Sequence, residues 1–205
     1  MERNGKKTKT LGLLYGNLSL GGIQRGASFQ IPMFKAMGYR IVVLSVQPPA
    51  DCEYVIPEID VRVCIGADSA ETRSKNVETA AREHGLDLIV HHAAYDAAML
   101  SADIEGARRA GVPVVIFWHN VFSHFYLRKF RQLEAKELFA ACRAATAMIT
   151  LTKTDEAFFR MMRALMSMRS LLACTPQFMP EALFTTMPPT MAEPMEAGSG
   201  GNTRP

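Results

Sequence analysis

Short apolar runs alternate with longer amphipathic stretches along most of the chain, and this alternation restricts the fold more than any other feature. Near-continuous apolar runs are typical of strands buried on both faces, while spacing near 3.6 residues indicates helices between them. We therefore predict strands at residues 11–15, 40–45, 61–65, 87–91, 112–118 and 147–151. Strand–helix alternation of this kind predicts an α/β chain with a Rossmann-like, doubly wound and mostly parallel sheet.

Glycines and capping residues indicate where the intervening helices begin and end. The spacing predicts helices over about 21–37, 74–84, 96–110, 126–143 and 153–166. Gly85 is at the position where a helix commonly ends in a left-handed residue. Asp96 is expected to cap its helix, which is a structural role. Thr152 and Asp155 have the spacing of a capping box, in which each side chain satisfies a free backbone N–H.

The net charge of +3 in this 205-residue chain is confined to its beginning, where Arg3, Lys6, Lys7 and Lys9 outnumber Glu2. A nucleic-acid binder normally carries a basic face on its folded part, so we expect no nucleic-acid partner. The composition predicts a basic, disordered N-terminus at 1–9 and one Rossmann-like domain at 10–184. Proline, glycine and methionine without periodicity predict a disordered tail at 185–205.

The remaining composition points to the cytoplasm and to an absence of cofactors. No apolar run approaches the roughly 20 residues of a membrane span, and no secretory signal is recognisable. The four cysteines are widely spaced and form no C-x-x-C pair, which favours reduced thiols. His119 and His124 have no cysteine or carboxylate at ligand spacing, so we expect no metal.

Ligands of open parallel sheets bind beyond the carboxyl ends of the strands, and Gly21 and Gly22 follow the first strand directly. Glycines at a helix N-terminus let an anion such as a phosphate approach free backbone N–H groups. The alternative is a turn that needs one residue at positive φ. The pattern is neither a dinucleotide fingerprint nor a P-loop.

Four of the five histidines are predicted to lie at this same edge of the sheet: His91, His92, His119 and His124. An imidazole at the position of His119 can act as a general base or bind a ligand near neutral pH. The alternative is a histidine that bonds to backbone at a strand end. Adjacent strand residues point to opposite faces, so at most one of His91 and His92 can face a cleft.

Aromatic and basic residues are mixed from Phe117 to Arg131. This mixture suits a membrane interface or a lipid-linked ligand. The alternative is a set of aromatic side chains that completes the core, with solvated charges opposite.

Taken in order, these segments resemble family 4 glycosyltransferases of the GT-B fold. Residues 20–25 are similar to the family's G-G-x-E/Q-R opening, and 35–43 to its step into the second strand. Residues 87–92 are similar to D-V-V-H-x-H, 110–119 to G-V-P-V-V-x-T-x-H, and 144–152 to A-D-x-V-I-x-x-S. The resemblance covers about residues 11–166.

The resemblance implies one half of a GT-B architecture and transfer that retains the anomeric configuration without a metal. His119 would line the cleft as the catalytic candidate. Gly21, Gly22, Arg25, His92 and Asn120 would bind donor phosphates or acceptor. The implied partners are a nucleotide-sugar donor and a glycan or lipid-linked acceptor of cell-surface polysaccharide or glycolipid synthesis. Peripheral contact with the inner membrane face is the accompanying expectation.

The family's donor-binding domain carries an E-x7-E motif, and no room for it follows the sixth strand and its helix. We therefore expect a chain truncated before that domain and not competent alone, because it would lack the groups that stabilise the leaving nucleotide. Two alternatives stay open. One is a binding half that joins a separate C-terminal-type subunit. The other is a different nucleotide-binding Rossmann-like enzyme.

Overall fold

A computed structural model describes residues 8–19, 21–92, 96–121 and 132–171 of the chain. Its elements in chain order are β1 (Thr10–Tyr15), α1 (Gly22–Ala36), β2 (Arg40–Ser45), β3 (Val61–Cys64), α2 (Ala70–Glu83), β4 (Leu88–His91), α3 (Ala97–Arg109), β5 (Val114–Phe117), α5 (Gln132–Ala144), β6 (Ala147–Ile149) and α6 (Lys153–Leu171). The six strands, the helices α1, α2, α3 and α5, and the first part of α6 belong to a unit that extends to Leu165. A second unit comprises Met166–Pro205.

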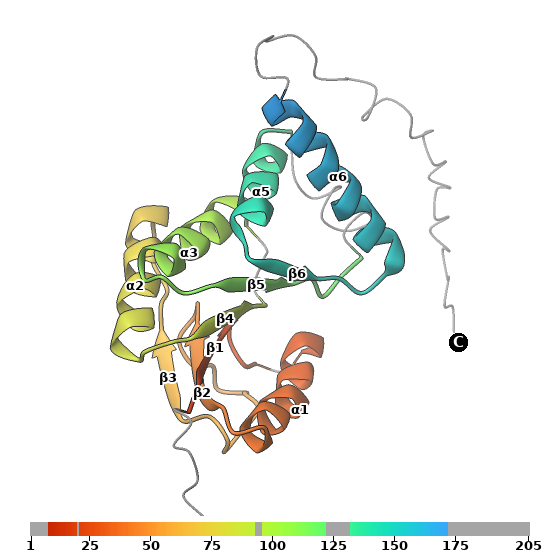
Figure 1. Cartoon of the computed structure of the whole chain (residues 1–205). Helices are drawn as coiled ribbons and strands as arrows, with labels where there is room; N and C mark the ends of the chain where they lie inside the picture. Colours follow the sequence, from red (N-terminus) through yellow and green to blue (C-terminus); the bar gives the residue numbers. More distant parts are fainter. Residues whose placement is uncertain (1–7, 20, 93–95, 122–131, 172–205) are drawn as a thin grey trace, which may run out of the picture. The chain divides into compact units, whose positions relative to one another are not determined.

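The six strands form one parallel sheet in the order β3-β2-β1-β4-β5-β6 (Figure 1). This is the strand order of Rossmann-like folds, so the predicted fold class is confirmed. The order reverses direction between β1 and β4. At such a switch point the connections leave to opposite sides, and a crevice opens beyond the carboxyl ends of the two strands.

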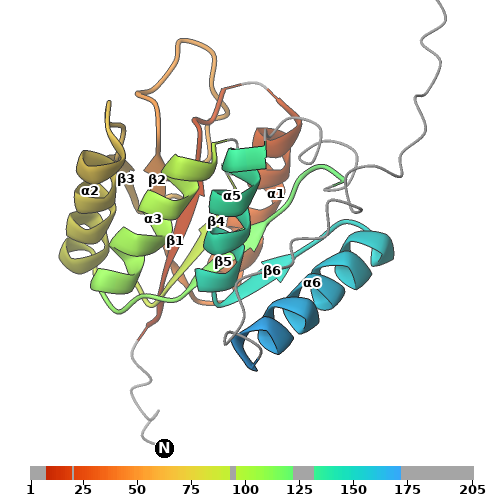
Figure 2. The ribbon, with the colours of Figure 1, turned by 90° about the horizontal axis from the view of Figure 1, so that it is seen from above.

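Helices cover both faces of the sheet, with α1 on one face and α2, α3 and α5 on the other (Figure 2). Alternate strand residues belong to two separate apolar cores. Leu13 and Val43 pack with Ile31 of α1, whereas Leu14 and Val42 belong to the core of the opposite face. Burial on both sides explains why the strands read as continuous apolar runs.

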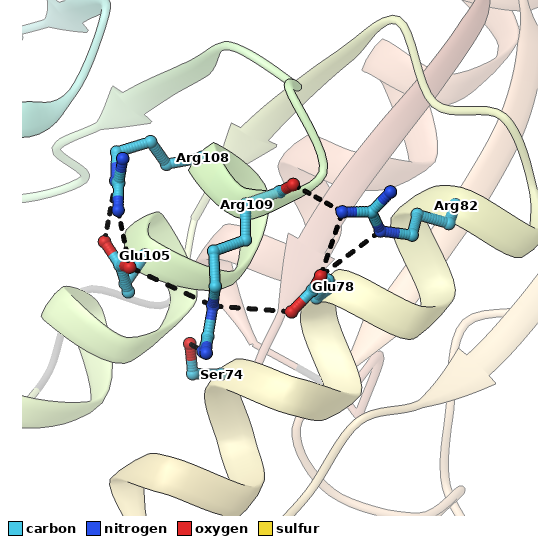
Figure 3. Close-up of polar contacts among 6 residues, drawn as sticks. All are labelled: Ser74, Glu78, Arg82, Glu105, Arg108 and Arg109. Carbon is cyan, nitrogen blue, oxygen red and sulfur yellow. Dashed lines mark hydrogen bonds and ion pairs between the residues drawn. The ribbon is translucent and has the colours of Figure 1, made fainter.

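The contact between α2 and α3 depends on Gly106, where an added Cβ would lie 2.2 Å from the carbonyl oxygen of Ser74. Polar side chains also link α2 to the C-terminal end of α3 (Figure 3). Arg82 Nη2 and Arg109 Nε lie 3.0 Å and 3.4 Å from the Glu78 carboxylate. Exposed pairs of this kind contribute little, so close packing stabilises the contact more than charge.

The predicted helix ends are mostly confirmed. Gly38, Gly85 and Gly111 have φ of +90°, +58° and +74°, as left-handed C-terminal residues should. The Oδ1 atom of Asp96 accepts from Met99 N at 2.9 Å. Thr152 Oγ1 accepts from Asp155 N at 3.0 Å, so this half of the predicted capping box is confirmed.

Several boundaries differ from the prediction, and the last helix, predicted to end at residue 166, runs to Leu171. The helix predicted from residue 74 begins at Ala70, because Ser69 caps it by accepting from Thr72 N at 3.2 Å. The fifth and sixth strands are shorter than predicted, at Val114–Phe117 and Ala147–Ile149. Residues 122–131, where the predicted 126–143 helix begins, lie outside the described part of the chain.

The predictions of disorder concern residues that the structure describes in small part or not at all. Residues 1–7 and the whole 185–205 segment lie outside the described ranges. Among the described helices, none combines the length and the apolar character that crossing a membrane requires.

Candidate functional site

Four aromatic rings from three strands stack at the switch point of the sheet. Tyr15 ends β1, His92 follows β4, and Phe117 and His119 lie at the end of β5. The rings of Tyr15 and His92 are parallel within 8°, with centroids 4.5 Å apart. His92 is 5.3 Å from Phe117, and Phe117 is 4.5 Å from His119. The stack therefore joins the carboxyl ends of β1, β4 and β5.

A hydrogen bond joins the two histidines of this stack, with Nδ1 of His92 2.7 Å from Nε2 of His119. Only 3% of the surface of His92 is exposed, whereas His119 is half-buried. Burial lowers the pKa of His92 well below its usual 6.5, and the neighbouring His119 and His91 lower it further. Burial also lowers the pKa of His119. Both rings are therefore neutral at physiological pH, and they share one proton between the facing nitrogens.

Two buried polar atoms of the stack have no hydrogen-bond partner among the described residues. They are the hydroxyl oxygen of Tyr15 and Nε2 of His92. Burial raises the pKa of Tyr15 above its usual value, so the hydroxyl keeps its proton. Unpartnered buried polar groups are costly in a structural core and are more often found at functional sites.

His91 faces the other side of β4, as the alternation of strand side chains predicts. Its Nε2 lies 2.8 Å from Asp103 Oδ2, and Arg73 binds the same carboxylate through Nε at 2.6 Å and Nη2 at 3.0 Å. All three side chains are buried. Of the two adjacent histidines, His92 therefore belongs to the edge site and His91 to a charged network beneath α2 and α3.

Gly21 and Gly22 open α1 beside the end of β1. Gly21 is the N-cap with an extended φ of −178°, and no side chain caps the helix. Neither glycine is among the described residues with positive φ, so the proposed turn at positive φ is wrong. A Cβ at Gly22 would meet no atom of the described residues within 4 Å. Neither backbone strain nor packing therefore requires glycine at position 22, and the room beside this helix N-terminus is open to a ligand.

A hydrogen-bond network around Asn17 holds the loop that leads into α1. Asn17 Oδ1 accepts from Ser19 Oγ at 2.6 Å, its amide donates to Gln47 Oε1 at 2.8 Å, and its carbonyl accepts from Gln24 Nε2 at 3.3 Å. The sequence placed Asn17 after the first strand but gave no reason to choose it. Its role depends on Gln47, which is 30 residues away.

A partly buried ion pair between Arg62 and Glu53 restrains the neighbouring β2–β3 loop. Arg62 binds Glu53 through two nitrogens, one of them 2.9 Å from Oε1. Hydrogen bonding from Arg62 lowers the pKa of Glu53 to about 2. The same carboxylate accepts from Leu18 N at 3.3 Å, so this pair also restrains the β1–α1 loop.

The other predicted site residues are more peripheral. Arg25 is exposed in the first turn of α1, and its backbone N–H donates to Gly21 O at 2.8 Å. Asn120 is half-buried directly after His119. Phe117 packs against the core on the α1 side, and Trp118 is fully buried on the other. His124 and the aromatic residues from 122 to 130 lie outside the described ranges.

Cysteines and possible metal ligands are further candidates for chemistry in the described part of the chain. Within the described ranges, no group of three or more histidine, cysteine or acidic side chains is placed to hold a metal ion. Cys142 is buried, and burial raises the pKa of its thiol to about 12. Cys52 lies in the β2–β3 loop and Cys64 is the last residue of β3, and both are exposed.

Comparison with protein families gives a match that covers most of the chain. The model of Glycosyltransferase Family 4 matches residues 20–162, which include every predicted site residue. No curated protein sequence matches the chain.

Solved structures show a distant likeness. One is a Listeria monocytogenes protein named as a UDP-N-acetylglucosamine 2-epimerase, with 10% identity over 72% of this chain and a TM-score of 0.44. Another is an alpha-glucosyltransferase in complex with UDP and a 13-mer DNA, with 15% identity over 69% of this chain and a TM-score of 0.43. The matches span 40% and 37% of the lengths of those two chains.

Proposed function

Because this chain belongs to glycosyltransferase family 4, we propose that it forms the acceptor-side half of a retaining, GT-B-type glycosyltransferase. The reaction would move a sugar from a nucleotide-sugar to a glycan or lipid-linked acceptor. The observation that carries this proposal is the place of His119. It is half-buried at the switch point, where Rossmann-like sheets bind ligands.

A neutral imidazole in this position suits a sugar. One ring nitrogen of His119 is engaged by His92, and the other can bond to a hydroxyl or ring oxygen. Because the ring is fixed before the ligand arrives, no ordering cost is added on binding. His119 would therefore orient the reacting sugar.

The N-terminus of α1 would bind the anionic part of a ligand. Backbone N–H groups without a side-chain cap and the positive end of the helix dipole favour negative charge. Arg25 lies in the same first turn and is exposed. The open room at Gly22 lets a phosphate oxygen approach the backbone closely.

The nucleotide itself would be held by the second Rossmann-like domain that the family architecture implies. Cell-surface polysaccharide or glycolipid synthesis would use glycan or lipid-linked acceptors of this kind. These assignments predict that ligand contacts of this chain gather at one edge of the sheet, near Gly22 and His119.

The test is a titration of the full chain, labelled with ¹⁵N, with uridine-, guanosine-, thymidine- and adenosine-diphosphate sugars and with a short-chain lipid-phosphate acceptor. We expect at least one ligand to shift the amide signals of Gly22 and His119 while those of His84, on the opposite edge, stay fixed. The Gly22→Ala variant should keep its thermal stability and lose at least tenfold in affinity. Shifts confined to other surfaces, or none with any ligand, would contradict the proposal.

A second candidate function is a binding half that associates with a separate C-terminal-type subunit. Three large apolar side chains near the end of the described chain are exposed, namely Ile149, Leu151 and Met161. Exposed apolar residues in this region are what a covering partner would explain.

That candidate is tested by substituting the exposed residues. A Leu151→Asp variant of the full chain should lose association with an added C-terminal-type glycosyltransferase domain in analytical ultracentrifugation. Val55→Asp is the matched control, because Val55 is 94% exposed and lies on the β2–β3 loop. Equal behaviour of the two variants would remove this candidate.

A further inference from the structure

We propose that His92 is a positioning residue: its Nδ1–H donates to Nε2 of His119 and so holds His119 in the tautomer that carries its proton on Nδ1. The inference rests on the proposed function, since it specifies which atom of His119 meets the sugar. It also assigns His92 a role different from direct ligand binding. The argument uses the stack, the burial of His92 and its unpartnered nitrogen.

The stack prevents the His92 ring from turning away from His119. Tyr15 lies parallel to one side at 4.5 Å, and Phe117 stacks at 5.3 Å. Rotation of the imidazole would have to displace these rings, whose residues belong to strands β1 and β5. The 2.7 Å contact between the two histidines is therefore fixed by packing before any ligand binds.

Burial makes His92 unsuited to contact a ligand itself. Its surface is 3% exposed, whereas His119 is half-buried. A charged imidazolium is strongly disfavoured at such a site. His92 can therefore act on a ligand only through its neighbour, and the hydrogen bond to His119 is the contact that allows it.

The unpartnered nitrogen decides the direction of the hydrogen bond. Nε2 of His92 has no partner among the described residues. In a neutral imidazole one nitrogen carries the proton and the other a lone pair. Orphaned buried N–H groups are rarer in proteins than under-satisfied acceptors. The proton of His92 therefore belongs on Nδ1, where it is donated, and the lone pair belongs on Nε2.

The tautomer of His119 follows from this direction. Its Nε2 accepts from His92, so its own proton is on Nδ1. His119 then offers a hydrogen-bond donor, which suits a sugar hydroxyl, a ring oxygen or a phosphate oxygen. If the direction were reversed, His119 would offer a lone pair and act as an acceptor or base. The pair thus determines which chemistry His119 supplies.

The experiment reads the tautomers directly by long-range ¹H–¹⁵N spectra of the full chain labelled on histidine, without ligand. We expect His119 to be in the Nδ1–H form in the native protein, assigned through loss of its signals in His119→Ala. His92→Asn, whose amide can donate from the same place, should preserve this form. His92→Phe, which keeps the stack and removes the hydrogen bond, should give a mixture of both forms.

His84→Phe is the control, because His84 follows α2 and is remote from the stack. An Nε2–H form of His119 in the native protein would overturn the proposal, as would an unchanged tautomer in His92→Phe. The native measurement uses only His119→Ala, for signal assignment, so it holds even if substitution of His92 impairs folding. Because no ligand is added, its failure is separate from failure of the sugar titration.

Discussion

His91 and His92 are neighbours in sequence with opposite surroundings. His91 is buried beside Asp103, whose carboxylate also binds Arg73 through two nitrogens. His92 is buried among the rings of Tyr15 and Phe117, and its Nε2 has no partner among the described residues. The first histidine belongs to a charged network between helices, and the second belongs to an apolar stack at the ligand edge.

The difference teaches that burial alone does not make a histidine structural. The charged network joins β4, α2 and α3, and removal of one member leaves an uncompensated group. The stack contains no charge, and two of its buried polar atoms, the Tyr15 hydroxyl and His92 Nε2, have no partner among the described residues. Substitutions at the two sites should therefore separate effects on stability from effects on the site.

The largest effect is expected from Asp103→Asn. Loss of the carboxylate charge leaves Arg73 buried without its counter-ion, which costs roughly 3–5 kcal/mol of unfolding free energy. Urea denaturation followed by circular dichroism measures this loss. Glu105→Gln on the same helix is the control and should change stability by less than about 0.5 kcal/mol, because its pair with Arg108 is exposed. A loss below about 1 kcal/mol for Asp103→Asn would contradict this account.

The same substitution at the two histidines should give different losses. His91→Phe deprives the buried Asp103 of a donor, which costs about 1–3 kcal/mol. His92→Phe keeps the stack, removes one unpartnered atom and loses one hydrogen bond to the half-buried His119, so we expect a net change within about 1 kcal/mol. Parallel urea titrations measure both. Equal losses would show that the two environments do not differ energetically.

Stability should decrease as the pH falls below about 6.5. Burial lowers the folded-state pKa of His92 and of His119, so below the unfolded-state value of 6.5 the unfolded chain binds protons that the folded chain does not. Each such histidine removes at most about 1.4 kcal/mol per pH unit. Urea midpoints between pH 7.5 and 5.5 measure the slope, which should be smaller in His92→Phe and unchanged in His84→Phe. A flat profile in this window would show that the histidines are not desolvated.

The smallest effect is expected from Tyr15→Phe. The hydroxyl of Tyr15 is buried without a partner among the described residues, so its removal loses no hydrogen bond and ends a desolvation cost. We expect the unfolding free energy to be unchanged or raised by up to about 1 kcal/mol. A loss above about 1 kcal/mol in thermal or urea unfolding would mean that this hydroxyl has a partner.

The strands, most helix ends and the sheet edge that carries the candidate site could be predicted from the amino-acid sequence. Apolar runs reveal burial on both faces, and Gly85 or Asp96 act through their own local backbone. These properties depend on residues that are close together in the sequence, so they can be predicted without the tertiary structure. The order of the motifs likewise allowed the family resemblance to be recognised from the sequence. The start of α2 was predicted too late, at residue 74, because its N-cap, Ser69, lies outside the periodic pattern of apolar residues.

Which side chains meet depends on the tertiary structure. His92 and His119 are 27 residues apart, and Arg73 and Asp103 are 30 apart. Their contacts depend on strand order and register, which no local sequence pattern specifies. The tertiary structure also showed that Gly22 is not required by its backbone or its packing. Periodicity predicts on which face of the sheet a side chain lies. Only packing brings side chains of distant strands together on that face.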